Sequence, residues 1–210
     1  MTTQEDVEFV VHSIADTALE QEEYFCQLDS VVGDGDFGYS LARGFERVLE
    51  EWGDYDRTDP GVFLQKVAKT IMSRVGGTSG PIWGTAFLRA GSALKGHGEA
   101  SASDVVAALR SCVDGIKARG QAELGEKTLL DALVPAIDTL EAEMAGGATT
   151  SDGLAAMAVT ARQTAEATAG LQARRGRASY TGERSIGSVD AGAMGVAVFI
   201  EKLAEAWPHR

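Results

Sequence analysis

Three aspartates lie within eight positions of one glycine-rich stretch, residues 28–38, which reads Leu-Asp-Ser-Val-Val-Gly-Asp-Gly-Asp-Phe-Gly. Carboxylates this close together repel one another unless a cation lies between them. Oxygen ligands favour Mg²⁺, Ca²⁺ or Mn²⁺ over zinc, and three of them leave coordination positions free for water or phosphate oxygens. Asp29, Asp34 and Asp36 are therefore predicted to bind a divalent metal ion. The alternative is a plain acidic surface turn, because Asp-Gly pairs are common in turns.

Two other known patterns fit this stretch poorly. Residues 33–38 match the GxGxxG pattern of dinucleotide-binding loops, but those loops follow a strand in a βαβ unit, and no parallel-sheet pattern surrounds them here. Asp34 and Asp36 would also bring two negative charges to the pyrophosphate. An EF-hand needs a glutamate at the twelfth position, where counting from Asp29 gives Ser40.

Several further stretches could contact phosphate. Residues 76–81 (Gly-Gly-Thr-Ser-Gly-Pro) offer backbone N–H groups, two hydroxyls and a helix start. Residues 173–185 concentrate arginine, which can bind phosphate through two parallel hydrogen bonds. Taken singly, these stretches also fit a capped loop and surface ion pairing, and Asp190 fits a plain helix N-cap. Residues 120–128 are not a Walker motif, because Glu126 separates the glycine from the lysine and no strand precedes them.

The elements that must position these residues are predicted to be helices. Apolar residues recur at helical spacing in about eight segments, and no segment alternates over a strand length. The segments are residues 5–25, 41–52, 60–75, 78–96, 105–116, 129–140, 154–169 and 190–203. Asp59-Pro60 predicts a capped helix start. Short connections favour antiparallel neighbours, so we expect an all-α, up-and-down closed barrel or bundle with its unusual loops on one rim.

Composition describes one domain, residues 1–210, with 44% hydrophobic residues and a net charge of −12. The negative charge disfavours nucleic acid and anionic membrane surfaces as partners. The two cysteines have no metal-ligand spacing and suggest free thiols in a reducing compartment. No segment approaches the apolar length of a membrane span, so a cytoplasmic protein is expected.

Together the stretches resemble the ADP-binding L subunit of dihydroxyacetone kinase, which is also the C-terminal domain of single-chain dihydroxyacetone kinases. The matching stretches follow the family's order at residues 28–36, 76–81, 125–133, 176–180, 182–187 and 190–193. Any one of them is a weak signal, whereas six in order over most of the chain are specific. The resemblance implies a barrel of eight antiparallel helices, in agreement with the periodicity.

The resemblance also implies a site. Asp29, Asp34 and Asp36 would hold two Mg²⁺ ions that bridge the phosphates of ADP or ATP, and Arg177 would join them in the catalytic set. The implied nucleotide contacts are Phe37, Gly38, Tyr39, Ser40, Thr78, Ser79, Gly120, Leu129, Arg177, Asp190, Ala191 and Gly192. The chain would transfer a phosphoryl group to dihydroxyacetone or a similar short ketose held on a separate K subunit. A phosphocarrier of the phosphotransferase system is a second implied partner, and a homodimer stays open.

Two departures from the family pattern fall in nucleotide-contact loops. Phe37 stands where phosphotransferase-system members usually have histidine, and residues 187–193 replace the usual Gly-His-Gln-Asp-Pro-Gly-Ala. They leave open whether ADP is retained and rephosphorylated or free ATP exchanges, and whether the substrate is a four-carbon keto sugar. Phe37 also leaves room for a non-catalytic ADP-sensing partner that docks on a regulator. A stand-alone phosphohydrolase is a further alternative.

Overall fold

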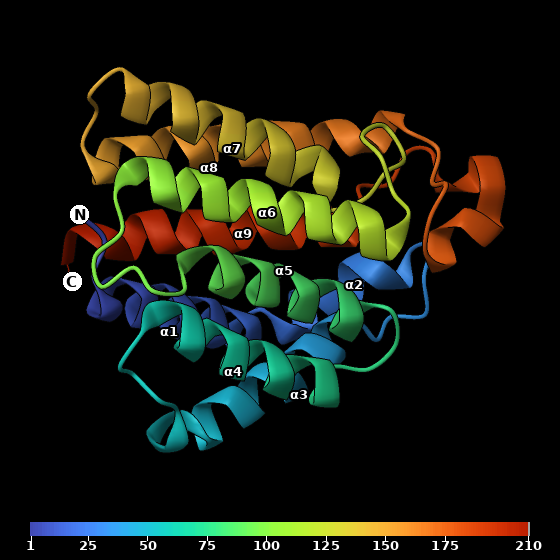
Figure 1. The fold of residues 1–210 in the computed structure, drawn as a ribbon. Coiled ribbons are helices and arrows are strands. Elements are labelled where there is room, and N and C mark those ends of the chain that lie inside the picture. The colour runs from blue at the N-terminus through green and yellow to red at the C-terminus, as the bar shows by residue number, and fades with distance from the viewer. Residues whose placement is uncertain (210) are drawn as a thin grey trace. The chain divides into compact units, whose positions relative to one another are not determined.

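The computed structural model describes residues 1–209, and helices account for its regular structure (Figure 1). No β-strand occurs in this range, where the only β-type pairing is an isolated bridge between Thr2 and Ala100. The predicted all-α fold is confirmed. The α-helices are α1 (Gln4–Glu20), α2 (Glu22–Ser30), α3 (Phe37–Glu50), α4 (Pro60–Arg74), α5 (Ser79–Leu94), α6 (Ala102–Gly120), α7 (Leu130–Ala145), α8 (Thr150–Ala167) and α9 (Ala191–Ala206), and 3₁₀ segments cover Trp52–Asp54, Thr168–Gly170, Arg177–Ser185 and Trp207–His209.

The first predicted helix, residues 5–25, is in fact two helices. It breaks at Gln21, whose φ of −101° and ψ of 13° leave the helical region, and α2 then continues to Ser30. Apolar spacing could not show this break, because the residues on both sides keep a helical period. The consequence for the site is that Asp29 lies in the last turn of α2 and not in the loop that follows.

The chain forms two compact units, which are described separately. Unit 1 comprises Met1–Leu19 and Ser40–Gly120, and unit 2 comprises Glu20–Tyr39 together with the chain from Gln121 onward. Helix α3 therefore begins in unit 2 and continues in unit 1. The predicted single domain and the closure of all helices into one barrel involve both units and stay predictions.

In unit 1, helix α5 packs between α4 and α6. Helices α4 and α5 approach closely at two glycines: a Cβ on Gly61 would lie 2.4 Å from the carbonyl oxygen of Gly91. As the sequence predicted, Asp59 caps α4, accepting a 2.9 Å hydrogen bond from the backbone N–H of Val62. Between α5 and α6, the buried thiol of Cys112 on α6 donates a 3.1 Å hydrogen bond to the carbonyl of Ala86 on α5.

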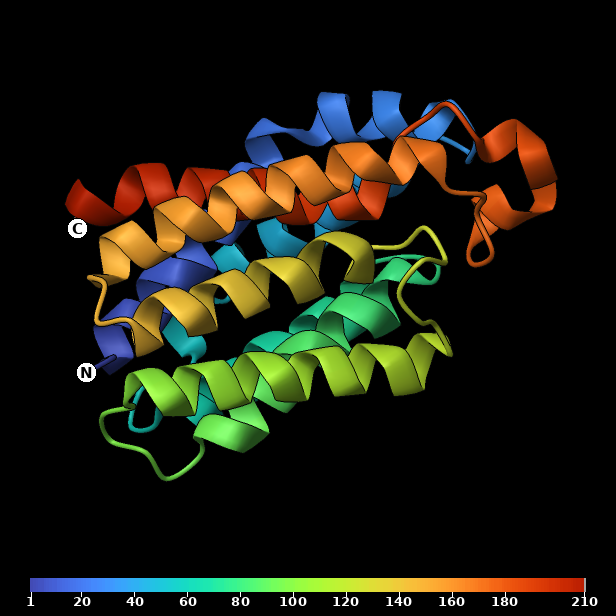
Figure 2. The same cartoon turned by 90° about the horizontal axis from the view of Figure 1, so that it is seen from above.

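In unit 2, helix α8 packs against both α7 and α9, and the three lie side by side in the two views (Figure 2). Helix α2 packs on α9 through the fully buried Phe25, whose ring centroid lies 5.7 Å from that of Phe199. Apolar residues of α7, α8 and α9 thus form the core on which α2, and with it Asp29, is fixed. No helix within residues 1–209 is long and apolar enough to cross a membrane.

Candidate metal and nucleotide site

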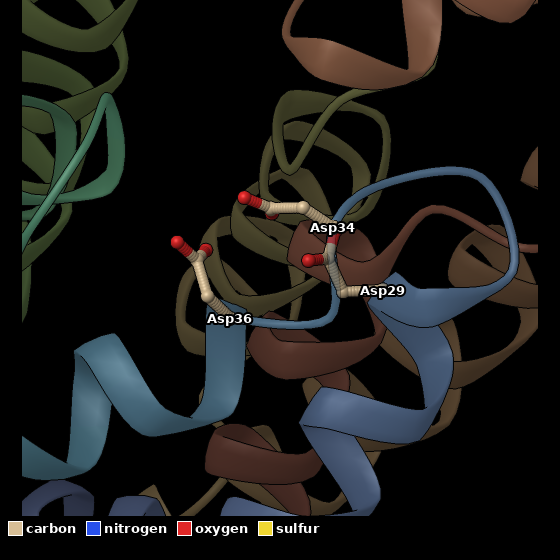
Figure 3. A group of neighbouring side chains, drawn as sticks. All are labelled: Asp29, Asp34 and Asp36. Atoms are coloured by element: carbon tan, nitrogen blue, oxygen red, sulfur yellow. The ribbon is translucent and has the colours of Figure 1, made fainter.

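Asp29, Asp34 and Asp36 converge as the sequence predicted. One carboxylate oxygen from each lies within 4.8 Å of the other two, and Figure 3 shows the three side chains facing a common space. Asp29 projects from the end of α2, while Asp34 and Asp36 come from the loop before α3. Asp29 is half-buried and the other two are exposed, so the group is open to ligands on one side.

Backbone contacts fold this loop over Asp29. Its carboxylate accepts a 2.9 Å hydrogen bond from the N–H of Gly35, and its carbonyl accepts one of 2.6 Å from Gly33. A Cβ at position 33 would lie 2.2 Å from an Asp29 carboxylate oxygen, and Gly35 has a φ of +76°, which disfavours other residues. The glycines are therefore needed to bring the three carboxylates together.

The start of α3 is tightly built against α2. Gly38 is buried, and a Cβ there would lie 2.0 Å from the carbonyl oxygen of Glu22. The ring of Phe37 is also buried, with its centroid 5.8 Å from that of Phe25. The N–H of Tyr39 already donates to the Cys26 sulfur over 3.2 Å, while its side chain is exposed. Phe37 therefore contributes its ring to the core, and its backbone is what it can offer a ligand.

Arg177 is brought to two of the three aspartates. Its guanidinium forms an ion pair with Asp34 and lies 3.3 Å from a carboxylate oxygen of Asp36. All three side chains are about half exposed, so water screens these contacts and their net contribution to stability is small. The guanidinium nevertheless supplies the positive charge that the carboxylates need when no metal ion lies between them.

The segment that carries Arg177 is more ordered than the sequence suggested. Residues Arg177–Ser185, which lie outside the predicted helices, form a 3₁₀ segment that is interrupted at Gly182, where φ is +59°. Its base is held by Lys127, which is 2% exposed and donates to the carbonyls of Leu171 and Ser185 over 3.1 and 2.5 Å. Sequence reasoning missed Lys127 as a functional candidate, although its place inside a family stretch was an available signal.

Asp190 caps α9 next to Leu129. Its carboxylate accepts a 2.8 Å hydrogen bond from the N–H of Ala193, and a Cβ on Gly192 would lie 3.4 Å from that of Leu129. Burial raises the pKa of Asp190 to about 7, against the lowering effect of the Ala193 N–H; Asp131 raises it further and Lys127 lowers it. Leu129 and the turn at residues 190–192 thus lie next to each other in unit 2.

Four predicted contacts, Ser40, Thr78, Ser79 and Gly120, belong to unit 1. Thr78 is exposed at the start of α5, and its side chain makes no capping hydrogen bond. A Cβ on Gly76 would lie 3.5 Å from the hydroxyl oxygen of Ser40, so the glycine-rich loop and Ser40 are neighbours. Gly120 ends α6. The predicted contacts are thus divided between the two units, with Ser40, Thr78, Ser79 and Gly120 in unit 1 and the others in unit 2.

The donor set suits a hard divalent cation. It consists of carboxylate oxygens only, at a spacing that one or two ions can bridge, and it excludes a thiolate or imidazole zinc site. The combination of an acidic, exposed metal-type site with an arginine and a capped helix start is typical of proteins that bind a phosphate ester through a metal ion.

The comparison with protein families agrees with this class: residues 31–205 match the DAK2 domain, and the chain belongs to that family. The chain is 38% identical over 186 residues to the ADP-binding subunit DhaL of the PEP-dependent dihydroxyacetone kinase of Escherichia coli, with 89% of each chain covered. It is 34% identical to the ADP-binding subunit of a PTS-dependent dihydroxyacetone kinase from Lactococcus lactis, covering 89% of this chain and 88% of that subunit.

Larger kinases also contain a matching part. A D-erythrulose kinase of Mycolicibacterium smegmatis is 32% identical over 92% of this chain, which corresponds to 34% of that enzyme. The crystal structure of the dihydroxyacetone kinase of C. freundii has a TM-score of 0.74 at 26% identity; the match covers 95% of this chain and 34% of that one. A second structure of that kinase, with AMP-PNP and Mg²⁺, has a TM-score of 0.72 at 24% identity over 94% and 33%, and shows the same fold.

Proposed function

We propose that this chain is the nucleotide-binding subunit of a dihydroxyacetone-type kinase, and that it holds ADP or ATP with Mg²⁺. The observation that carries the proposal is the convergence of Asp29, Asp34 and Asp36 within 4.8 Å on an open side of unit 2. The relatives named as ADP-binding subunits of dihydroxyacetone kinases support the nucleotide and the substrate class.

In this proposal the three aspartates hold two Mg²⁺ ions. Bound Mg²⁺ would neutralise the phosphate oxygens, which is the main requirement of phosphoryl transfer and leaves little covalent work for side chains. Asp29 is fixed by the Gly35 N–H and provides the rigid part of the group. Arg177 balances Asp34 and Asp36 before the metal binds, and afterwards its guanidinium can turn to a phosphate oxygen.

The remaining nucleotide contacts are proposed from both units. Phe37, Gly38 and Ser40 would offer backbone groups at the start of α3, whereas the Tyr39 N–H is already bound to Cys26. The hydroxyls of Thr78 and Ser79 would bind phosphate. Leu129, Asp190, Ala191 and Gly192 would line the rest of the nucleotide, and Gly120 of unit 1 is a further proposed contact. Since these residues come from both units, we propose that residues 1–210 act as one nucleotide-binding domain.

The proposed partner is a sugar-binding K subunit that presents a short ketose for phosphorylation. A phosphocarrier of the phosphotransferase system is the proposed phosphodonor, because the relatives that are 38% and 34% identical are named as subunits of a PEP-dependent and a PTS-dependent kinase. A four-carbon ketose is the alternative substrate, since an erythrulose kinase is 32% identical. Incubation with a K subunit, each sugar and each phosphodonor in turn distinguishes these options by the sugar phosphate formed.

Calorimetric titration tests the metal-bridged site. We expect ADP to bind at least about tenfold more weakly in EDTA than in Mg²⁺, and Asp34→Asn or Asp36→Asn to remove that difference, because each loses a charged metal ligand. Asp114→Asn, on the exposed side of α6, is the matched control and should behave as wild type. Equal ADP affinity of the wild type in Mg²⁺ and EDTA would contradict the proposal.

The ADP-sensing alternative depended on Phe37, and the structure gives that residue a different role. Its ring packs in the core with Phe25, and the nearest atom of the ring lies 3.3 Å from a Cβ built on Gly195. An aromatic residue at position 37 is thus explained by packing. If no sugar phosphate forms with a K subunit under any phosphodonor while ADP still binds, sensing becomes the better explanation.

A further inference from the structure

Lys127 is a buried lysine whose ammonium group contacts only backbone oxygens among the hydrogen bonds of the described chain. Nζ donates to the carbonyls of Leu171, Ser185 and Ser188 over 3.1, 2.5 and 2.6 Å. The three donors of the ammonium group are therefore all used. The residue is 2% exposed, so water cannot replace these partners.

The acceptors lie at the two ends of one segment. Leu171 precedes the 3₁₀ segment Arg177–Ser185, Ser185 is its last residue, and Ser188 follows it. The same base contains a 2.9 Å hydrogen bond from the Ala173 N–H to the Ser185 hydroxyl. Lys127 thus closes the arginine loop, which we define as residues 171–188, and Arg177 projects from the closed loop.

The cost of this arrangement suggests a role beyond stability. Lys127 has a φ of +61°, a conformation that non-glycine residues adopt rarely and at a cost. Burying an ammonium group is also costly unless every donor is satisfied. Burial lowers the pKa of Lys127, and Asp190 opposes that effect. An apolar residue could fill the same space, but the carbonyls of Leu171 and Ser188 would lose their donor, and Ser185 would keep only the Ser188 hydroxyl, 3.0 Å away. The loop ends would also lose their link.

From this geometry we propose that Lys127 is a positioning residue for the transfer reaction, which acts through Arg177. Lys127 joins both ends of the arginine loop and so holds the Arg177 guanidinium next to Asp34 and Asp36. There the guanidinium neutralises the carboxylates and can bind a phosphate group. The proposal rests on the proposed nucleotide-binding function. In the described chain, the hydrogen bonds of the Lys127 ammonium group go to Leu171, Ser185 and Ser188 and not to the three aspartates of the metal site, so its effect must pass through the loop.

The position of Arg177 has two measurable consequences. A correctly placed guanidinium competes with Mg²⁺ for Asp34 and Asp36 in the absence of nucleotide, and it assists transfer once nucleotide and metal are bound. A variant that releases Arg177 should therefore bind Mg²⁺ alone more tightly and yet transfer phosphate more slowly. General loss of structure would weaken both properties, so the opposite directions distinguish positioning from folding.

The experiment compares Lys127→Met, Arg177→Gln, the double variant and the wild type, with Lys69→Met on the exposed side of α4 as control. We expect Lys127→Met and Arg177→Gln each to bind Mg²⁺ alone about two- to fivefold more tightly, as loss of a half-exposed ion pair implies. Each should lower kcat for sugar phosphate formation at least about tenfold, the loss of one charge-assisted hydrogen bond.

The double variant decides whether the two residues act together. If Lys127 acts through Arg177, the double variant is no slower than the slower single variant, because the effects are not additive. Multiplied losses in the double variant, or Mg²⁺ affinity that falls together with helical circular dichroism in Lys127→Met, would overturn the proposal. Lys69→Met should match the wild type in every measurement.

A second variant covers the case in which Lys127→Met does not fold. Glu126→Gln weakens the exposed ion pair with Arg175, 2.7 Å long, which holds the same loop base from the surface. Glu126→Gln should bind Mg²⁺ alone more tightly and have a lower kcat, both to a smaller extent than Lys127→Met. Wild-type values for both would overturn the proposal. Wild-type protein without Mg²⁺-dependent ADP binding would instead refute the proposed function. A wild type that binds and transfers while Lys127→Met equals Lys69→Met would refute this inference alone.

Discussion

At the residue scale, the two cysteines, Cys26 in unit 2 and Cys112 in unit 1, differ in what they can report. Cys26 is half-buried, and its sulfur accepts the N–H of Tyr39 at the start of α3. Cys112 is buried in unit 1, and burial raises its pKa to about 12. Thiol reagents attack the thiolate, so only the first of these cysteines is suited to report on the site.

Thiol labelling at pH 8 should therefore modify Cys26 and leave Cys112 unmodified in the native protein. Mg²⁺ with ADP should slow the labelling of Cys26, because a ligand at residues 36–40 restrains the backbone that covers its sulfur. Mass spectrometry of peptides after a timed alkylation measures both rates, and Cys26→Ser identifies the signal. An unchanged rate with saturating Mg²⁺ and ADP would show that the start of α3 is not part of the site.

At the scale of the elements, much of the site lies at helix ends. The sequence predicted some of these ends and not others. Asp59-Pro60 and Asp190 predicted the starts of α4 and α9, because capping is local chemistry that leaves a mark in a few neighbouring residues. The break at Gln21 and the 3₁₀ segment around Arg177 were not predicted. The 3₁₀ segment is held by contacts with residues distant in the chain, such as the link from Lys127 to Ser188, and periodicity cannot show such contacts. The residues on both sides of Gln21 keep a helical period, so periodicity cannot show that break either.

Asp190 gives the start of α9 a pH dependence of unusual sign. Its pKa rises from 3.8 in the unfolded chain to about 7, mainly through burial, so the folded state binds the extra proton between those values. The contribution of Asp190 to the free energy of unfolding is therefore most favourable below about pH 4 and is lost as the pH rises to about 7.

Asp190→Asn should remove this dependence and keep the cap, because the amide oxygen can still accept the Ala193 N–H. Relative to wild type, the variant should gain up to a few kcal/mol between pH 4 and pH 7. Urea unfolding at each half pH unit measures the difference. Parallel curves for the two proteins over that range would show that Asp190 is ionised throughout.

At the scale of the whole molecule, the proposed nucleotide contacts are divided between unit 1 and unit 2. Local patterns predicted all-α structure and the acidic group in unit 2, because helix period and like-charge spacing are readable along the chain. They do not show how segments far apart in sequence pack, so the proposed contribution of Ser40, Thr78 and Ser79 from unit 1 does not follow from them. The residues that match the DAK2 domain, 31–205, extend over both units.

A double substitution tests the contribution of unit 1. Thr78→Ala with Ser79→Ala should weaken Mg²⁺-dependent ADP binding by about tenfold, the loss of two hydroxyl hydrogen bonds of about 0.7 kcal/mol each. The affinity for Mg²⁺ alone should not change, because the three aspartates lie in unit 2. Calorimetry gives both constants, and Ser103→Ala at the start of α6 serves as control. Unchanged ADP affinity would restrict the site to unit 2.

The close contact at Gly38 has a consequence for how this protein can be varied in the laboratory. In a library that randomises residues 37–40 and is selected for folding alone, position 38 should return glycine, because any Cβ there meets the carbonyl oxygen of Glu22 at 2.0 Å. Position 39 should accept many residues, since the Tyr39 side chain is 56% exposed. Selection for phosphoryl transfer would then reduce the set of residues accepted at position 39 only if the side chain there touches a ligand or partner. Comparing the two selections therefore distinguishes a structural requirement at position 38 from a functional one at position 39.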